Sequence, residues 1–290
     1  MYYGARLGVA LALTWAFVGC APDRSSTDGA GASSSAAEAP KPAPASVAVK
    51  ATDFAFEAPA QVPAGAVTIQ LENQGKELHQ AQLIKLEDGK TVQDLGAAFK
   101  THGPPPSWMK FVGGPNGIAP GQQSNSTSVL APGQYAYICL IPSPDGVLHA
   151  AKGMVRPFEV IVASSNAANT QPETDVTIKL VDYDFQSSQP LAAGKQRILV
   201  ENMGPQAHEL VLVKLAPGKT IEDFATWAES MKGPPPALPV GGVGALEKGM
   251  RGAFTADLTA GDYGLICFVP DTKDGKMHMR HGMMKNLKVG

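Results

Sequence analysis

The sequence contains the same unit twice, and this duplication constrains the fold more than any other feature. The segments 47–163 and 176–290 align along their length, with an offset that stays between 128 and 130 residues. VAVKATDFAFE in the first copy matches VTIKLVDYDFQ in the second, and YAYIC matches YGLIC. A chain of 290 residues is long enough for two domains with their own cores. We therefore expect two copies of one fold, namely domain 1 at 46–163 and domain 2 at 175–290, joined by a polar linker at 164–174.

Within each copy the pattern is that of short strands separated by turns. QYAYICLI and DYGLICFV are apolar runs preceded by Pro-Gly and Ala-Gly, and the chain contains 31 Gly and 24 Pro. One helix is expected per copy, because Thr91 and Thr220 each precede an acid by three residues, Asp94 and Asp223, in a capping pattern. The following Gly-Pro-Pro-Pro run ends each helix. The predicted class is all-β, with two tandem Greek-key sandwiches or barrels, each containing a short inserted helix.

The first twenty residues predict export. Arg6 precedes an apolar run, Leu7 to Val18, that is too short to span a bilayer as a mature helix. The run leads to Cys20 in a context that resembles a bacterial lipobox, so 1–20 is predicted to be a lipoprotein signal peptide with Cys20 lipidated. An ordinary signal peptide with a coincidental cysteine is the alternative. Residues 21–45, rich in Ala, Ser and Pro, predict a disordered tether to a membrane, at the cell surface or in the periplasm.

Charge excludes one class of partner. The chain has 24 basic and 26 acidic residues, a formal net charge of −2. A nucleic-acid-binding face requires a basic surface. We therefore expect no nucleic-acid partner and contact with a membrane only through the lipid.

Two cysteines remain after Cys20, and each lies in an ordered set of soft and borderline donors. In an oxidising compartment Cys139 and Cys267 either pair with each other or each hold something else. Each copy has a His, a Cys, a second His and a Met in the same order. The two sets are His79, Cys139, His149, Met154 and His208, Cys267, His278, Met283. Two imidazoles, a thiolate and a weak thioether suit both Cu(I) and Cu(II).

This order of donors resembles the cupredoxin family over nearly the whole chain after the tether. The resemblance implies one type 1 copper site per domain, rigid and adapted to electron transfer with redox partner proteins. It also implies that the second histidines, His149 and His278, reach the surface as electron ports. The neighbouring sequence predicts an apolar docking patch beside His149, with Val147 and Leu148. A charged patch is predicted beside His278, formed by Lys273, Asp274 and Lys276.

Several positions depart from the family pattern. The residue after the first His is often Asn in cupredoxins, whereas Gln80 and Glu209 occupy it here and predict a weaker brace. His281 lies close enough to compete with His278 as ligand. His102 has Lys232 at the matching position and is expected in a loop.

The sequence also favours electron transfer over catalysis. It contains no His-x-His pair, and Ile138 and Ile266 precede the cysteines where copper nitrite reductases have a His that binds a second copper. We therefore predict that the chain is not an enzyme. The alternatives are a copper storage, delivery or tolerance protein, which the methionines 277, 279 and 284 would support, and a metal-free scaffold module.

Overall fold

Three β-sheets make up the framework of the described chain, which comprises residues 14, 16, 42–98, 105–163 and 168–290 of this computed structural model. The strands of the first copy are β1 Ala45–Thr52, β2 Ala55–Glu57, β3 Gln61–Pro63, β4 Gly65–Asn73, β5 Gln82–Leu86, β6 Met109–Phe111, β7 Gln123–Leu130, β8 Gly133–Ile138 and β9 Val155–Ile161. Those of the second are β10 Val176–Val181, β11 Asp184–Ser187, β12 Gly194–Asn202, β13 His208–Leu215, β14 Ala237–Leu246, β15 Arg251–Leu258, β16 Gly261–Ile266 and β17 Met284–Val289.

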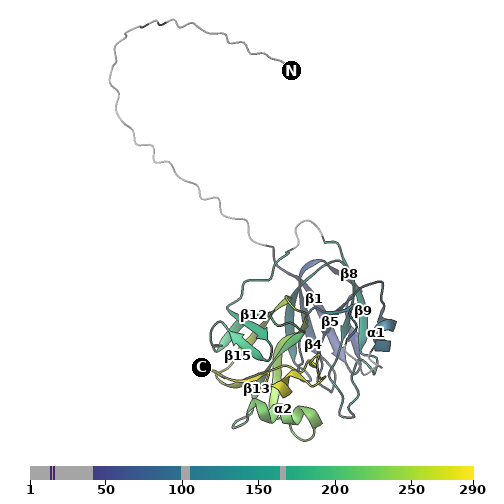
Figure 1. Cartoon of the computed structure of the whole chain (residues 1–290), viewed down its shortest axis with the longest axis vertical. Helices are drawn as coiled ribbons and strands as arrows, with labels where there is room; N and C mark the ends of the chain where they lie inside the picture. The colour runs from purple at the N-terminus through teal and green to yellow at the C-terminus, as the bar shows by residue number, and fades with distance from the viewer. Residues whose placement is uncertain (1–13, 15, 17–41, 99–104, 164–167) are drawn as a thin grey trace, which may run out of the picture. The chain divides into compact units, whose positions relative to one another are not determined.

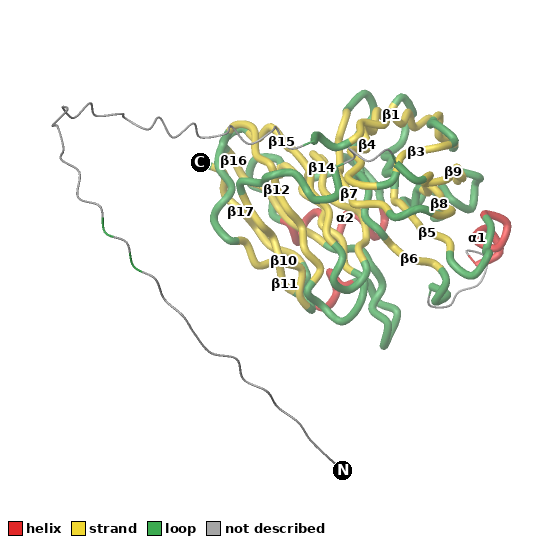
Figure 2. Tube along the Cα trace, turned by 90° about the horizontal axis from the view of Figure 1, so that it is seen from above, coloured by secondary structure: helices red, strands yellow, loops and turns green. Residues whose placement is uncertain are grey.

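Each copy is a two-layered β-sandwich, and the two copies share one sheet. The shared sheet has the order β11-β10-β12-β15-β7-β4-β1-β2, so the second copy forms one side and the first copy the other. The order β3-β9-β8-β5-β6 covers the first copy, and β14-β13-β16-β17 covers the second. Figure 2 shows these layers as adjacent groups of yellow strands. Both copies repeat one topology, with β1 parallel to β4 and β10 parallel to β12. The predicted all-β class is confirmed.

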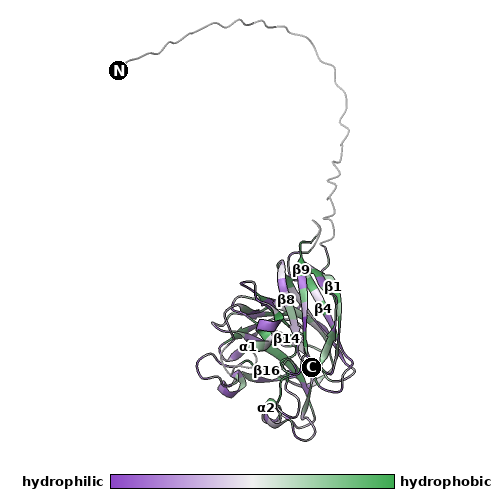
Figure 3. Cartoon of the chain, turned by 90° about the vertical axis from the view of Figure 1, so that its right-hand side faces the viewer, coloured by the Kyte–Doolittle hydropathy of each residue, from purple (hydrophilic) through white to green (hydrophobic). Residues whose placement is uncertain are grey.

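Alternating side chains explain why these segments form sandwiches. In β1, Val47, Val49 and Ala51 are buried and the residues between them are not. With a period of two, one face of the strand meets the core while the other faces away. Val49 and Ile69 of the shared sheet join one core with Leu83 of β5, across the sandwich. Figure 3 shows apolar and polar stretches next to each other on the same strands.

Both expected helices are present. They are α1 Val92–Ala98 and α2 Ile221–Ser230, and Figure 1 shows α1 near β9 and α2 near β13. Thr220 caps α2 by accepting from the backbone NH of Asp223, whose carboxylate accepts in turn from the NH of Thr220. Thr91 and Asp94 make the same reciprocal hydrogen bonds at α1. Each helix packs on the outer side of its sandwich, and the capping prediction is confirmed.

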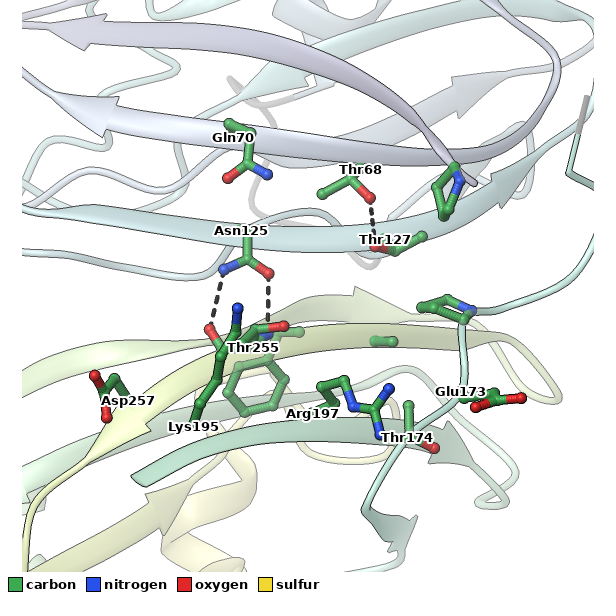
Figure 4. A pocket seen from close by; sticks show the side chains of 14 residues that line it. Thr68, Gln70, Asn125, Thr127, Glu173, Thr174, Lys195, Arg197, Thr255 and Asp257 are labelled. Carbon is green, nitrogen blue, oxygen red and sulfur yellow. Dashed lines mark hydrogen bonds between the residues drawn. The ribbon is translucent and has the colours of Figure 1, made fainter. Parts of the chain in front are cut away.

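Within the shared sheet the two copies join at a short seam between β7 and β15. Only Ser128 and Thr127 pair with Gly252 and Ala253. Beyond these pairs, the amide of Asn125 bridges the strands by hydrogen bonds with the backbone N–H and C=O of Thr255 (Figure 4). The strands border a polar pocket of about 600 Å³ that contains none of the predicted site residues.

Some predictions fall outside the described residues. They are the signal peptide 1–20 with Cys20 (only 14 and 16 are described), most of the tether, the first part of the linker at 164–167, and His102. The domain boundaries stay predictions, and residues 41–290 form one unit. Across the described residues, no helix combines the length and the apolar character needed to cross a bilayer.

Candidate metal centres

The first predicted donor set converges in the interior of the first sandwich. The two Nδ1 atoms of His79 and His149 are 3.1 Å apart. Sγ of Cys139 lies 3.3 Å from Nδ1 of His149 and 3.9 Å from Nδ1 of His79. All three side chains are fully buried, and so is Met154, which belongs to the same apolar cluster as Cys139. The structure therefore brings the two histidines and the cysteine together, with Met154 buried in the same core.

The second set has the same arrangement. Nδ1 of His208 and Nδ1 of His278 are 2.9 Å apart, and Sγ of Cys267 is 3.4 Å from Nδ1 of His278. These residues and Met283 are also fully buried. Cys139 and Cys267 are both free thiols. The alternative of a disulfide between the copies is therefore excluded.

Backbone hydrogen bonds fix the loop that carries three of the four donors. In the first copy the loop leaves β8 at Cys139 and returns to β9 after Met154. The NH of Cys139 donates to the carbonyl of Met154 at 3.3 Å, and the NH of Met154 donates to the carbonyl of His149 at 2.9 Å. In the second copy the same bonds join Cys267, Met283 and His278, at 3.2 and 3.0 Å. The 3₁₀-helix η1 His278–His281 lies within this loop.

A carboxylate orients the first histidine of each site. Nε2 of His79 donates to Asp53 at 2.8 Å, and Nε2 of His208 donates to Asp182 at 2.6 Å. With the proton on Nε2, the lone pair of each Nδ1 faces the thiol, which is the arrangement that metal-ligating histidines use. Burial, the larger influence, would raise the pKa of Asp53, but hydrogen bonds from His79 and the backbone outweigh it and lower the pKa.

Two glycines make room for these contacts. A Cβ atom on Gly75 would lie 2.5 Å from Nε2 of His79 and 2.4 Å from Oδ1 of Asp53. On Gly204 it would lie 2.5 Å from Nε2 of His208. The two aspartates, Asp53 and Asp182, and the two glycines were not among the predicted site residues. The signal was nevertheless present, since Asp53 aligns with Asp182 and Gly75 with Gly204 in the duplication.

The second histidines are covered, which corrects the expectation that they reach the surface. His149 and His278 are both 0% exposed. Phe54 packs edge-on against His149 with ring centroids 5.0 Å apart, and Tyr183 packs in the same way against His278 at 5.4 Å. Both aromatic side chains are half-buried. They occupy aligned positions and separate the imidazoles from solvent.

Beyond the aromatic cover, the two second histidines differ. Nε2 of His149 donates to Glu77 at 2.9 Å. Nε2 of His278 has no hydrogen-bond partner within the described chain, and the nearest carboxylate, Asp271, is 3.8 Å away. Desolvation and the neighbouring His208 lower the pKa of His278 to about 4.

Burial also governs the thiols. It raises the pKa of Cys139 to about 12 and raises that of Cys267 as well. Desolvation lowers the pKa of His79 and of His208. These directions favour protonated thiols and uncharged imidazoles at His79, His208 and His278, and the Nδ1 atoms of the two histidines in each centre face each other. A soft cation fits this donor set, because it accepts both Nδ1 lone pairs and replaces the thiol proton.

The residues next to the first histidines do brace the cysteines. The backbone NH of Gln80 donates to Sγ of Cys139 at 3.5 Å, and that of Glu209 donates to Sγ of Cys267 at 3.4 Å. The weaker brace predicted from the side chains of Gln80 and Glu209 stays a prediction. The side chain of Glu209 also accepts hydrogen bonds from Asn116 and from the backbone NH of Phe268.

The remaining candidates lie outside the donor clusters. His281 contacts Asp274 at 3.2 Å and stacks on Tyr183, so His278 is the histidine placed beside Cys267. Met279 is buried against α2 in an apolar cluster, and Met277 is exposed. Asp271, Asp274 and His281 form a further group of possible metal-binding atoms, but four hydrogen bonds already occupy the carboxylate of Asp271.

Comparison with known proteins gives matches among solved structures alone. No family model matches the chain, and no curated protein does. An auracyanin from Roseiflexus castenholzii is 20% identical, with a TM-score of 0.30, over 41% of this chain and 98% of that one. A copper-containing nitrite reductase from Thermus scotoductus is 12% identical, with a TM-score of 0.24, over 84% of this chain and 61% of that one. A blue copper oxidase from Nitrosomonas europaea is 15% identical, with a TM-score of 0.24, over 84% and 85%.

These matches correct one prediction. We expected a chain that is not an enzyme, because Ile138 and Ile266 replace a histidine and His-x-His pairs are absent. Structures similar to the chain nevertheless include a nitrite reductase and a blue copper oxidase, which are enzymes. The prediction is therefore contradicted. At these identities and TM-scores, neither the reaction nor any residue role is carried over from those proteins.

Proposed function

We propose that the chain is a copper-binding electron-transfer protein with two cupredoxin-like type 1 sites. The first site comprises His79, Cys139, His149 and Met154, and the second comprises His208, Cys267, His278 and Met283. The observation that carries the proposal is the duplicated convergence of two Nδ1 atoms and one Sγ atom. Copper bound by such donors accepts and releases one electron with little change in geometry.

Burial supports a carrier over a protein that hands its copper to others. All eight side chains lie at 0% exposure, so a bound ion would be enclosed by protein. Paired backbone hydrogen bonds within each loop also fix the positions of the cysteine, the second histidine and the methionine. Rapid exchange with an external chelator would require these loops to open. The exposed Met277 alone is a weak argument for copper delivery.

The test is to load the purified protein with Cu(II) and to record copper content, visible absorption and electron paramagnetic resonance. Two coppers per chain and an intense blue band from thiolate to copper are expected. Cys139→Ser and Cys267→Ser should each remove about half of the band, and the double variant should remove all of it. A colourless protein that binds only Cu(I), exchangeable with chelators, would favour copper handling. A protein that binds no copper would contradict both functions.

We also propose that the protein is exported and held at a membrane by lipid on Cys20. The support is the apolar run from Leu7 to Val18 and the tether-like composition of 21–45. Growth with a radioactive fatty acid should label the wild-type protein, and Cys20→Ala should abolish the label and release the protein from membranes. Equal labelling of both proteins would contradict the proposal.

A further inference from the structure

A residue of the first copy lies beside the second donor set. The segment that contains Asn116 pairs with β14 of the second copy through bridges such as Pro115 with Val243 and Ile118 with Val240. Asn116 is 2% exposed. Its Nδ2 donates to the carboxylate of Glu209 at 3.0 Å. This hydrogen bond therefore runs from one copy to the residue that follows His208.

Glu209 also forms hydrogen bonds with Cys267 and with the residue that follows it. Its other carboxylate oxygen accepts from the backbone NH of Phe268, which directly follows Cys267, at 3.0 Å. The backbone NH of Glu209 donates to Sγ of Cys267 at 3.4 Å. Each carboxylate oxygen thus has one donor, and Glu209 is 7% exposed. A buried carboxylate that lost one of these donors would be costly, because little water reaches it.

The first donor set has no equivalent brace. Gln80 replaces Glu209, and its side chain makes no hydrogen bond among the described residues. Gly244 aligns with Asn116, because VGG at 112–114 matches VGG at 240–242. A Cβ atom on Gly244 would lie 2.5 Å from Oε1 of Gln82, which occupies the space beside this glycine. The brace therefore runs in one direction only, from the first copy to the second site.

We propose that Asn116 is a positioning residue of the second metal centre, acting through Glu209 on Phe268 and Cys267. The second site is then completed by the first copy, while the first site is complete within its own sandwich. The role in metal binding rests on the proposed function. The positioning of Phe268 can be measured without any metal.

The test compares Asn116→Leu with a matched control in the full chain. Leucine has a similar size but cannot donate. The control is Gln82→Leu, which removes another buried cross-copy contact, in which Gln82 accepts from Ala245 N at 2.6 Å and donates to its carbonyl at 3.0 Å. Gln82 touches neither donor set. If Asn116→Leu does not fold, Glu209→Gln serves instead, since its amide keeps the size and turns one accepting oxygen into a donor.

Two readouts are needed. In the metal-free protein, amide hydrogen exchange at Phe268 should become at least about tenfold faster in Asn116→Leu and stay unchanged in Gln82→Leu. In a Cys139→Ser background loaded with Cu(II), Asn116→Leu should alter the copper hyperfine splitting of the second site and weaken copper binding by about tenfold. In a Cys267→Ser background it should leave the first site unchanged.

The outcomes separate this inference from the proposed function. Unchanged exchange at Phe268, or an equal increase in both variants, would overturn the positioning role whether or not copper binds. Faster exchange with an unaltered second-site signal would overturn the role in metal binding. An absence of type 1 signals from the wild-type protein would instead contradict the proposed function, and the exchange data would still decide the positioning of Phe268.

Discussion

The two candidate metal centres have the same backbone arrangement and differ in the acidic residues that surround the donors. In both, Asp53 or Asp182 orients the first histidine, and the same hydrogen bonds close the loop between the cysteine and the methionine. In the first centre the next carboxylate, Glu77, accepts from the second histidine. In the second centre Nε2 of His278 has no hydrogen-bond partner within the described chain, although the buried Asp271 lies 3.8 Å from it. A further buried acidic residue, Glu209, lies on the cysteine side.

This difference shows which parts of the duplicated unit are under geometric constraint. The donors and the loop must keep their positions for three atoms to converge, and these positions are alike in the two copies. The outer carboxylates act through charge and orientation, so they can change place without disturbing the convergence. The two centres are therefore expected to bind one kind of ion with different affinities and reduction potentials. Substitutions in one copy can be judged against the other.

The largest expected effect on stability comes from substituting the glycines that leave space for the carboxylates of Asp53 and Asp182. Neither Gly75 nor Gly204 has a positive φ, so alanine is acceptable to the backbone and the cost is steric. Gly75→Ala would bring Cβ within 2.5 Å of both His79 and Asp53, whereas Gly204→Ala meets Asp182 at 3.1 Å. We expect each to lower the free energy of unfolding by about 1–3 kcal/mol, with the larger loss for Gly75→Ala.

Urea unfolding of the metal-free protein and titration with Cu(II) measure this effect. Gly96→Ala in α1 is the control, because an added Cβ there meets nothing within 4 Å. Wild-type stability in both variants would show that the close packing of Asp53 and His79 is not required. A larger loss in Gly204→Ala would reverse the predicted order of the two copies.

The second prediction tests what the two centres have in common. Asp53→Asn and Asp182→Asn remove the charge that holds each imidazole with its proton on Nε2. Outer partners of this kind contribute about 10–100-fold to metal affinity. We expect copper affinity to fall by a factor in this range at the substituted site and to stay unchanged at the other. Competition with a Cu(II) chelator measures both affinities. Equal losses at both sites from one substitution would show that the centres are not independent in this respect.

The third prediction exchanges a feature between the copies. Gln206 of the second copy aligns with Glu77, so Glu77→Gln gives the first centre the residue type of the second. Less negative charge beside the second histidine disfavours the more positive, oxidised ion. The reduction potential of the first site should rise, by about 60 mV for a tenfold change in the ratio of the two affinities.

A redox titration of each single-site protein measures this shift. Glu57→Gln is the control. Glu57 lies on β2 of the same copy, is exposed, and forms an ion pair with Lys50 of β1. A potential that stays constant in Glu77→Gln, or that moves equally in the control, would show that the hydrogen bond from His149 does not tune this centre.

The sequence was sufficient for features that are local or repeated. Short apolar runs preceded by turn residues predicted the strands, and the Thr-x-x-acid pattern at Thr220 predicted a helix start. The order of donors in both copies predicted which side chains converge. The aligned Asp53 and Asp182 could have been found in the same way, because the duplication acts as a two-sequence alignment.

Features that depend on how elements meet could not be found in this way. Phe54 and Tyr183 lie in the turns between β1 and β2 and between β10 and β11, and nothing local indicates that they cover an imidazole. Asn116 and Glu209 are 93 residues apart and have Gly244 and Gln80 at the aligned positions. No repeat signals their contact, which depends on how the two sandwiches pack. The shared sheet also depends on how the two sandwiches pack. The pairing of β7 with β15 that joins it covers only two residue pairs, too few to leave a pattern in the sequence.

The smallest expected effect concerns an ion pair that only the second copy has. Asp175 accepts from Arg197 at 2.7 Å, and hydrogen bonds from the side chain and backbone of Arg197 lower the pKa of Asp175 to about 2. The aligned residues in the first copy are Ser46 and Thr68. An acid whose folded pKa is depressed contributes stability above its ordinary pKa of 3.8, and this contribution is lost as the pH falls through about 2.

Asp175→Asn should therefore slightly accelerate amide hydrogen exchange in β10 and β12 at pH 5, while β1 and β4 stay unchanged. The pair is exposed and screened by solvent, so the effect should be small and should shrink further in high salt. Well below pH 2 wild type and variant should converge, because the wild-type carboxylate is then largely protonated. A difference that persists there would assign the contribution to the hydrogen-bond geometry of Asp175 rather than to its charge. A change that extends to β1 and β4 would show that the shared sheet transmits a local loss at one edge to the other copy.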